Sequence, residues 1–321
     1  MPRSMKIAII GAGMAGLTCG GQLRRSGHDV SMFDKGRGAG GRMATRRIEQ
    51  GGQTFRFDHG AQYFTARDPA FVERVREWER EGIVARWPAA GEGAWVGTPA
   101  MNAPIRAMAD TLDVQFGRRI ESIARAGSGG DDGWRLVGKG APDMRFDAVV
   151  VAVPAEQAGP LLEPHSANLA DLAHWVASAP CWAAMVAFDV RLDAPDTISD
   201  AFPSDSPLAW AARNSSKPGR NAAQECWVLH ATPEWSRRNL ERKEDEVRDE
   251  LLTALEAHVG PLRQVVMSSA HRWRYAMCEK NDTGAVWDAQ LRLGACGDWT
   301  SGPRVENAFL SGHALAGKIA G

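Results

Sequence analysis

The chain has 321 residues, of which 44% are hydrophobic, and a formal net charge of −1 at pH 7. That length suggests about two domains. The balanced charge, without a basic stripe, argues against a nucleic-acid partner, and no apolar stretch approaches the ~20 residues that a membrane span needs. The five cysteines form no CxxC pair, and the N-terminal apolar run is too short for a secretory signal, so we expect a cytoplasmic protein.

The first motif is a glycine-rich turn between a strand and a helix. An apolar run at 7–10 leads into Gly11, Gly13 and Gly16, which have the spacing GxGxxG. In a nucleotide-binding fold Gly11 permits the tight turn, Gly13 lets the backbone approach a pyrophosphate, and Gly16 lets the helix pack on the strand. The phosphates then lie at the helix N-terminus, where free N–H groups favour negative charge. An accidental cluster of glycines is the alternative.

An acidic residue and a second glycine turn extend this motif. The apolar run at 30–33 predicts a second strand, and Asp34 closes it about 20 residues beyond the glycines, where a ribose-binding carboxylate is expected. An acid there favours a ribose without a 2′-phosphate. The following Gly40-Gly41-Arg42 turn would bring backbone amides and one guanidinium to the pyrophosphate. A flexible loop with a solvated Arg42 is the alternative.

The middle of the chain predicts one helix and four strands. Asp68-Pro69 opens a helix over 69–81, as an N-cap followed by a first-turn proline. Strands are predicted at 114–116, 119–124, 134–137 and 146–153, and the turn-rich stretch 127–133 separates the middle two. Because 148–153 is apolar throughout, it should be buried on both faces of a parallel sheet.

Beyond Pro154 the pattern changes to that of an antiparallel sheet. The predicted strands are 182–190, 208–213, 226–231 and 265–273. An amphipathic helix at about 243–258 would cover that sheet. Residues 292–297 then return to the first domain.

The tail completes the nucleotide-binding signature. Gly297-Asp298 precedes a helix predicted over 305–320, with Pro303 at an early helical position. A Gly-Asp element near one end of the chain and GxGxxG near the other predict that both ends bind one flavin cofactor. The N-terminus of that last helix would stabilise the negative charge of a reduced flavin by its dipole.

These elements define the expected fold class and domains. The class is α/β, with a Rossmann-like FAD-binding domain and an interleaved α+β substrate domain built on a mostly antiparallel sheet. The FAD-binding domain is discontinuous and comprises residues 1–66, 104–160 and 288–321. The substrate domain comprises residues 67–103 and 161–287.

Aromatic residues and histidines supply the candidates for the substrate cleft. The chain has 12 tryptophans and 2 tyrosines, and tryptophan offers a flat apolar face with one donor. Trp210, Trp227 and Trp273 lie near polar clusters and are the better cleft candidates, although most tryptophans belong to the core. His230 is a candidate to face the flavin, or else a sheet histidine with its hydrogen bonds satisfied. No HExxH, zinc-ligand or G-x-S-x-G spacing is present, so no metal site is predicted.

Longer runs of the sequence resemble bacterial renalases, which belong to the amine-oxidase-like flavoprotein superfamily. The glycine elements and the Phe33-Asp34-Lys35 strand end are shared across that superfamily. More specific are 58–68, which reads Asp-His-Gly-Ala-Gln-Tyr-Phe-Thr-Ala-Arg-Asp, the run 210–220, and the run 271–276. The resemblance spans essentially the whole chain.

The resemblance implies non-covalent FAD with its ring system at the domain interface. It places Gly13 and Met14 at the pyrophosphate, and Phe33 and Asp34 at the ribose. Gly41 and Arg42 would contact the phosphates, and the backbone of Ile120 would contact the adenine. Gln62 and Tyr63 would lie beside the flavin ring, Asp298 would accept from the ribityl chain, and Val305 would face the pyrimidine end. Tyr63, Trp210, Trp273 and His230 are the candidates for catalytic contacts.

The resemblance also implies the reaction. Renalases oxidise the 2- and 6-dihydro isomers of NAD(P)H to NAD(P)+ and reduce O2 to H2O2. Arg67, Asp68 and Arg304 are then expected on the side of the dinucleotide substrate, and solvated surface charges are the alternative for the two arginines. Hydride loss from a carbon conjugated to an electron-rich ring nitrogen needs no general base, so the lack of an acid/base pair is compatible with this reaction.

Other functions stay open at this stage. An amine or polyamine oxidase would need an aromatic cage at the flavin, for which Tyr63 and Tyr275 are the only tyrosines, with Trp210 or Trp273 as a substitute wall. A desaturase or isomerase would favour a longer apolar tunnel. A dinucleotide-binding sensor or scaffold without turnover is a third class. The sequence does not indicate the oligomeric state or the choice between NAD and NADP.

Overall fold

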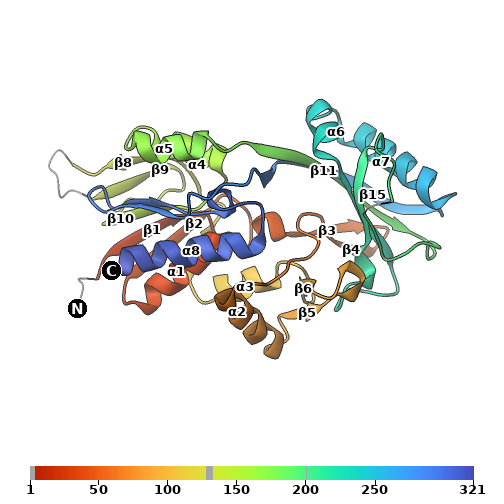
Figure 1. The fold of residues 1–321 in the computed structure, drawn as a ribbon, viewed down its shortest axis with the longest axis horizontal. Helices are drawn as coiled ribbons and strands as arrows, with labels where there is room; N and C mark the ends of the chain where they lie inside the picture. Colours follow the sequence, from red (N-terminus) through yellow and green to blue (C-terminus); the bar gives the residue numbers. More distant parts are fainter. Residues whose placement is uncertain (1–3, 128–132, 200) are drawn as a thin grey trace.

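Two sheets organise the fold, one in each half of the molecule (Figure 1). The computed structural model describes residues 4–127, 133–199 and 201–321. Most of the turn-rich stretch predicted at 127–133 therefore lies outside the described residues. The first half carries α1 and α8, and the second carries β11, β15, α6 and α7 (Figure 1).

The first sheet has six strands in the order β16-β17-β10-β1-β2-β7. All neighbouring pairs are parallel except β16 and β17. β10 lies between β17 and β1, and all four of its residues are buried, which confirms the prediction of a doubly covered parallel strand. The six strands are β1 (Lys6–Ile10), β2 (Asp29–Asp34), β7 (Asp113–Phe116), β10 (Ala148–Val151), β16 (Val286–Asp288) and β17 (Leu293–Ala295).

Helices cover both faces of this sheet (Figure 1). α1 (Met14–Arg25) and α8 (Val305–Ala320) pack on the face that carries Ile7 and Ile9. An added Cβ at Gly312 would overlap the carbonyl oxygen of Ala15, so this glycine lets α8 approach α1 closely. The other face packs against α4 (Ala155–Leu162), α5 (Ala167–His174) and the hairpin of β8 (Arg119–Arg125) and β9 (Trp134–Lys139).

The second sheet is antiparallel, with the strand order β12-β13-β14-β11-β15. Its strands are β11 (Ser178–Phe188), β12 (Thr197–Ile198), β13 (Leu208–Arg213), β14 (Glu225–Ala231) and β15 (Val265–Cys278). α6 (Pro233–Arg238) and α7 (Glu244–Val259) cover one face. On the opposite face, Phe55 and Phe57 of the hairpin β3 (Thr45–Gln50) and β4 (Gln53–Asp58) pack against Met185 and Val228.

The remaining elements connect the two halves. They are α2 (Pro69–Arg80), α3 (Ala103–Ala109), β5 (Val84–Arg86) and β6 (Trp95–Gly97). α2 packs on α8, with the rings of Phe71 and Phe309 5.0 Å apart. Sequence patterns assigned α2 to the substrate domain and β3–β4 to the FAD-binding domain, yet each contacts a core of the other half. The domain boundaries stay a prediction.

Most of the predicted elements are present within a few residues of the expected bounds. β10 begins at Ala148 rather than 146, because Phe146 only makes an isolated bridge to Trp134. β15 extends to Cys278, beyond the predicted end at 273. α8 begins at Val305, as predicted, and Pro303 precedes its N-cap, Arg304, rather than standing at an early helical position.

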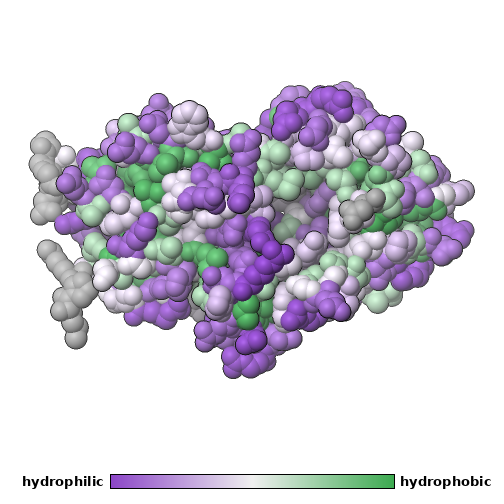
Figure 2. Space-filling view, in the orientation of Figure 1, coloured by the Kyte–Doolittle hydropathy of each residue, from purple (hydrophilic) through white to green (hydrophobic). Residues whose placement is uncertain are grey.

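Hydrophilic side chains cover most of the face in Figure 2 and gather along the boundary between the two halves. Among the described residues, no helix combines the length and apolar character needed to cross a membrane.

Candidate active site

The predicted phosphate turn has the geometry that an anion needs. Gly11 has a φ of +106°, and an added Cβ there would overlap the carbonyl oxygen of Ala152. Gly16 is equally constrained by the carbonyl of Gly11, whereas nothing lies within 4 Å of a Cβ added at Gly13. α1 begins at Met14 with no side-chain cap and no acidic residue in its first turn. Its first N–H groups therefore face open space in which a phosphate fits.

Asp34 lies beside this turn, as predicted for a ribose ligand. One carboxylate oxygen accepts from the backbone N–H of Ala12 at 2.8 Å, and the other accepts from Gly36 at 2.6 Å. The preceding Phe33 is fully buried, and its carbonyl accepts from Gly11 at 2.8 Å. Ile120, at the start of β8, belongs to the same core cluster as Phe33. The carboxylate is thus held at the carboxyl end of β2 with lone pairs left for a hydroxyl.

The two ends of the chain meet at Arg42 and Asp298. The guanidinium of Arg42 binds the Asp298 carboxylate with two nitrogens, at 2.6 and 2.8 Å. The Cys278 thiol also donates to that carboxylate, with the sulfur 3.6 Å away. Gly41, which precedes Arg42, is exposed, and a Cβ added there would have nothing within 4 Å. The positions predicted for the phosphates and for the ribityl chain are therefore adjacent.

The segment from Asp58 to Tyr63 packs on the Gly-Gly-Arg turn. Ala61 donates to the carbonyl of Arg42 at 2.9 Å, and a Cβ added at Gly60 would overlap that carbonyl. From the other side, the carbonyl of His59 accepts from Nε2 of His230 at 3.1 Å and from Nε1 of Trp273 at 2.9 Å. His230 and Trp273 therefore hold this segment on the second sheet.

This geometry resolves the alternatives for His230. Burial lowers its pKa to about 4, so the ring is neutral at neutral pH and donates from Nε2 to a backbone oxygen. His230 is a sheet histidine with a satisfied donor. Trp227 is not a cleft residue, because it is fully buried and its Nε1 donates to Glu225 at 2.7 Å.

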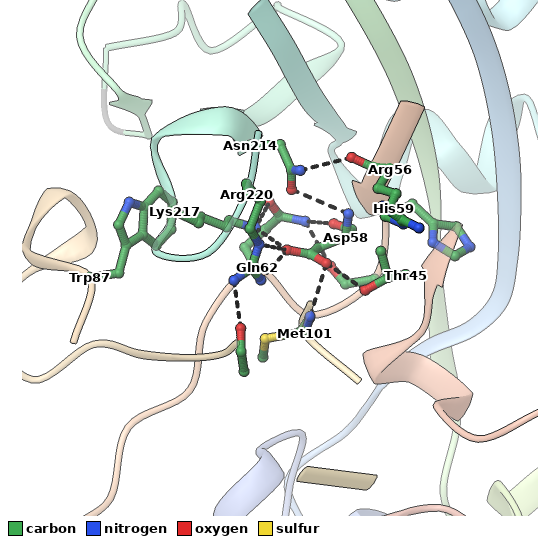
Figure 3. A network of polar contacts seen from close by, with 12 residues as sticks. Thr45, Arg56, Asp58, His59, Gln62, Trp87, Met101, Asn214, Lys217 and Arg220 are labelled. Atoms are coloured by element: carbon green, nitrogen blue, oxygen red, sulfur yellow. Dashed lines mark hydrogen bonds and ion pairs between the residues drawn. The ribbon is translucent and has the colours of Figure 1, made fainter. Parts of the chain in front are cut away.

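A buried ionic network lies behind this segment (Figure 3). The Asp58 carboxylate accepts from Thr45 at 2.6 Å, from the backbone of Met101 at 3.1 Å, from Nζ of Lys217 at 3.3 Å and from Arg220 at 2.6 Å. Lys217 also donates to Oε1 of Gln62 at 3.1 Å. Sequence reasoning did not place Lys217 or Arg220 at the site. The only signal for them was the 210–220 run, which had no structural context.

Burial and charge oppose each other in this network. Burial alone would raise the pKa of Asp58, but Lys217 and Arg220 outweigh it and hold that pKa far below its usual value. Burial lowers the pKa of Lys217 to about 8, against the opposing effect of Asp58. The side chains of Asp58, Lys217 and Arg220 are 0%, 0% and 4% exposed. At neutral pH the three groups carry a net charge of +1.

Two aromatic rings lie beyond Gln62. The ring of Tyr63 is 5.8 Å from that of Trp210, with an interplanar angle of 41°. Within the described part of the chain, the buried Nε1 of Trp210 has no hydrogen-bond partner. An unpartnered buried donor beside an aromatic pair is suited to a ligand that brings its own acceptor.

The residues predicted for the substrate side lie at the start of α8. A carboxylate oxygen of Glu306 accepts from the backbone of Arg67 at 2.5 Å and of Asp68 at 2.8 Å. Arg304 is the N-cap residue of α8, which begins at Val305, and its guanidinium donates to Thr65 at 2.9 Å. The Asp68 carboxylate caps α2 by accepting from Ala70 at 2.9 Å.

Comparison with known families decides the class of this site. Residues 85–320 match the flavin-containing amine oxidoreductase family, and residues 9–78 match the NAD(P)-binding Rossmann-like domain. The chain belongs to the flavin-containing amine oxidoreductases. It is a flavin-dependent oxidoreductase, and its cofactor is non-covalently bound FAD.

Solved structures of this family have the same fold. A putrescine oxidase bound to putrescine superposes with a TM-score of 0.74 and 13% identity over 99% of both chains. A cyclohexylamine oxidase from Brevibacterium oxydans gives a TM-score of 0.71 and 12% identity, also over 99% of both. A 4,4'-diapophytoene desaturase from Staphylococcus aureus is 43% identical over 51 residues, which is 16% of this chain and only a tenth of the relative's own length.

The residues present fit FAD. The open space above Gly13 and Gly41 and the uncapped start of α1 suit its pyrophosphate, and Asp34 suits the adenosine ribose. Arg42 and Asp298 would hold the phosphates and the ribityl chain between them. We assign these contacts as part of the proposal below.

Proposed function

We propose that this flavoenzyme oxidises the 2- and 6-dihydro isomers of NADH or NADPH to NAD+ or NADP+, as renalases do. The nicotinamide ring loses one hydride, which is equivalent to a proton and two electrons. O2 takes up these two electrons and this proton, together with one proton from solvent, and becomes H2O2. Bound FAD would supply the two-electron hydride acceptor between them. The protein then has to position the nicotinamide ring against the flavin ring and stabilise the negative charge that is transferred with the hydride.

The net positive charge buried behind Gln62 is the observation that carries this proposal. Lys217 and Arg220 exceed Asp58 by one charge, and all three side chains are shielded from water. In a poorly solvated region such a charge acts strongly on its neighbours. It favours the negative charge that arrives with a hydride, and it disfavours a protonated amine close to the same segment.

The histidines near the segment do not reverse this balance. Burial lowers the pKa of His59 to about 3 and that of His271 to about 4, so both rings are neutral at neutral pH, like His230. We assign Gln62, Tyr63 and Trp210 to the ring that donates the hydride, because two aromatic faces suit a nicotinamide and the unpartnered Nε1 of Trp210 suits its carboxamide oxygen. Arg67, Asp68 and Arg304 are assigned to the mouth of the site.

An amine oxidase is the second candidate, because the two oxidases with the same fold act on amines by name and Tyr63 and Trp210 form part of an aromatic wall. The test is anaerobic mixing of the FAD-loaded protein with 6-dihydro-NAD, putrescine, spermine and benzylamine in parallel. We expect 6-dihydro-NAD to bleach the visible flavin absorbance rapidly. The amines should bleach it slowly or not at all. Rapid loss with an amine alone would replace the proposal, and H2O2 released on admitting O2 would identify the final acceptor.

A further inference from the structure

A large cavity lies outside the predicted cofactor cradle. It is a groove with a volume of about 960 Å³, within the range of known ligand sites. None of its lining residues belongs to the set assigned to FAD. We name it the arginine groove, and it is lined by Arg37, Gly38, Ala39, Ala44, Thr45, Arg46, Arg47, His59, Asn102, Arg106, Ala109, Asp110, Leu112, Val114 and Phe116.

The charge of the arginine groove is strongly unbalanced. It contains four arginines and one carboxylate, Asp110. Arg47 is paired with Glu49 at 2.5 Å. Within the described residues, the guanidinium groups of Arg37 and Arg106 have no hydrogen-bonding or ionic partner. Guanidinium groups that lack a carboxylate partner and surround one cavity favour an anion, and their forked donors match phosphate oxygens.

Arg46 links the groove to the second sheet, because it lines the groove and contacts His271 of β15. Its guanidinium lies 3.3 Å from Nδ1 of His271. Because the His271 ring is neutral, Nδ1 can accept that hydrogen bond while the guanidinium keeps its full charge. The ring of His271 packs in turn against those of His59 and Trp273, with centroids 4.9 and 4.6 Å away. Arg46 is therefore attached to the residues that hold the Gln62 segment.

The groove has an apolar part as well as a charged part. Leu112 lies between α3 and β7, Val114 and Phe116 lie on β7, and all three are partly buried. The amide of Asn102 donates to the carbonyl of Ala39 at 3.0 Å and so fixes the loop that forms one wall. An apolar floor beside free guanidinium groups suits a ligand with both a planar base and phosphates.

The groove also adjoins the active-site segment in the chain. His59 lines it, and Gln62 and Tyr63, which we assign beside the reacting rings, follow three and four residues later. A dinucleotide carries its reactive ring and its adenosine at opposite ends of a pyrophosphate. Such a ligand has one end for each place, whereas an alkylamine has no group for the groove.

We propose that the arginine groove binds the pyrophosphate and adenosine of the dinucleotide substrate through Arg37, Arg46 and Arg106. This inference rests on the proposed function for the identity of the substrate. It goes beyond the sequence prediction, which placed the substrate cations at Arg67 and Arg304.

The test compares a double variant, Arg37→Gln with Arg106→Gln, with a control double variant, Arg237→Gln with Arg238→Gln on the far side of the second sheet. All four side chains are exposed, so both proteins should fold and retain FAD. The probe is ADP-ribose, which lacks the nicotinamide ring, and its binding to each FAD-loaded protein is measured by calorimetry. We expect at least tenfold weaker binding for the groove variant, no change for the control, and weaker wild-type binding at high salt. Binding within twofold of wild type, or no binding to the wild-type protein, overturns the proposal.

Flavin reduction separates this proposal from the proposed function. With 6-dihydro-NAD, the groove variant should need at least tenfold more substrate for half-maximal reduction and keep the wild-type limiting rate. A reduced N-alkyl nicotinamide, which has no phosphate, should reduce both proteins alike. If 6-dihydro-NAD fails to reduce even the wild-type flavin, the proposed function is wrong, and the ADP-ribose result alone decides the groove.

Discussion

The Nζ atom of Lys217 lies 3.1 Å from Oε1 of Gln62, although the two residues are 155 positions apart in the chain. The amide nitrogen of Gln62 donates to the carbonyl of Gly60 at 3.0 Å. The cation on one side and the carbonyl on the other fix which way the amide points. Lys217 is thus a positioning residue for Gln62 as well as a source of positive charge.

Replacing Lys217 with Met should slow hydride transfer without unfolding the site. Asp58 keeps Arg220, Thr45 and a backbone donor, so its charge stays compensated. Loss of one buried cation near the developing negative charge should lower the limiting rate of flavin reduction about tenfold, equivalent to about 1.4 kcal/mol. Stopped-flow absorbance measures this rate, and Lys243→Met on the exposed start of α7 is the matched control.

The pH profile distinguishes this role from a merely structural one. Since the pKa of Lys217 is about 8, its charge is present below pH 8 and lost above it. The wild-type limiting rate should therefore fall as pH rises through about 8, and Lys217→Met should lack that inflection. An identical inflection in both proteins would assign it to another group.

Sequence patterns predicted the fold better than the network around Lys217. The strand at 208–213 and the helix at 305–320 were predicted at their observed bounds, because apolar periodicity depends on local sequence. The hairpin β3–β4 was not predicted, because the charged side chains of Arg46, Arg47 and Glu49 interrupt the apolar pattern expected of a strand. Two glycine motifs assigned Arg42 and Asp298 to the same cofactor, but their ion pair was not predicted. Lys217 belongs to no such motif, and only the folded chain brings it to Asp58.

Acid should destabilise the protein through its buried neutral histidines. Burial lowers the pKa of His230 to about 4, whereas an unfolded histidine titrates near 6.5. Between these values the unfolded chain binds a proton that the native chain does not, so the free energy of unfolding falls as pH drops from about 6.5 to 4. His230→Gln retains an N–H donor for the carbonyl of His59 and cannot titrate. Between pH 7 and 4.5, the free energy of unfolding of this variant should fall by about 2–3 kcal/mol less than that of the wild type.

Urea unfolding at the two pH values, with FAD in excess, measures that difference. His313→Gln, on the exposed side of α8, is the control and should follow the wild type. If the free energy of unfolding falls equally in wild type and His230→Gln between the two pH values, the His230 ring does not contribute to the pH dependence.

Asp298→Ala should weaken the retention of FAD. The change removes a predicted acceptor for the ribityl chain and leaves the Arg42 guanidinium without its two hydrogen bonds at 2.6 and 2.8 Å. We expect binding to weaken by about 1–3 kcal/mol. The ratio of flavin to protein after gel filtration, and a fluorescence titration of the apoprotein, report the loss. A full complement of tightly bound flavin would mean that Asp298 serves only to hold Arg42.

Arg304 and Arg67 test the mouth of the site separately from the arginine groove. Both lie at the start of α8: Arg304 is its N-cap residue and donates to Thr65 at 2.9 Å, and the backbone N–H of Arg67 donates to Glu306 at 2.5 Å. If they contact the substrate's phosphates, replacing either with Ala should raise the concentration of 6-dihydro-NAD needed for half-maximal flavin reduction. The limiting rate should change less, because a contact remote from the transferred hydride serves the ground and transition states alike. Arg80→Ala is the matched control, since Arg80 lines the same shallow groove along α2 as Arg67. If the Arg67 and Arg304 variants both reduce at wild-type rates at every substrate concentration, the two arginines are surface charges, and dinucleotide binding must depend on other cations such as Arg37 and Arg106.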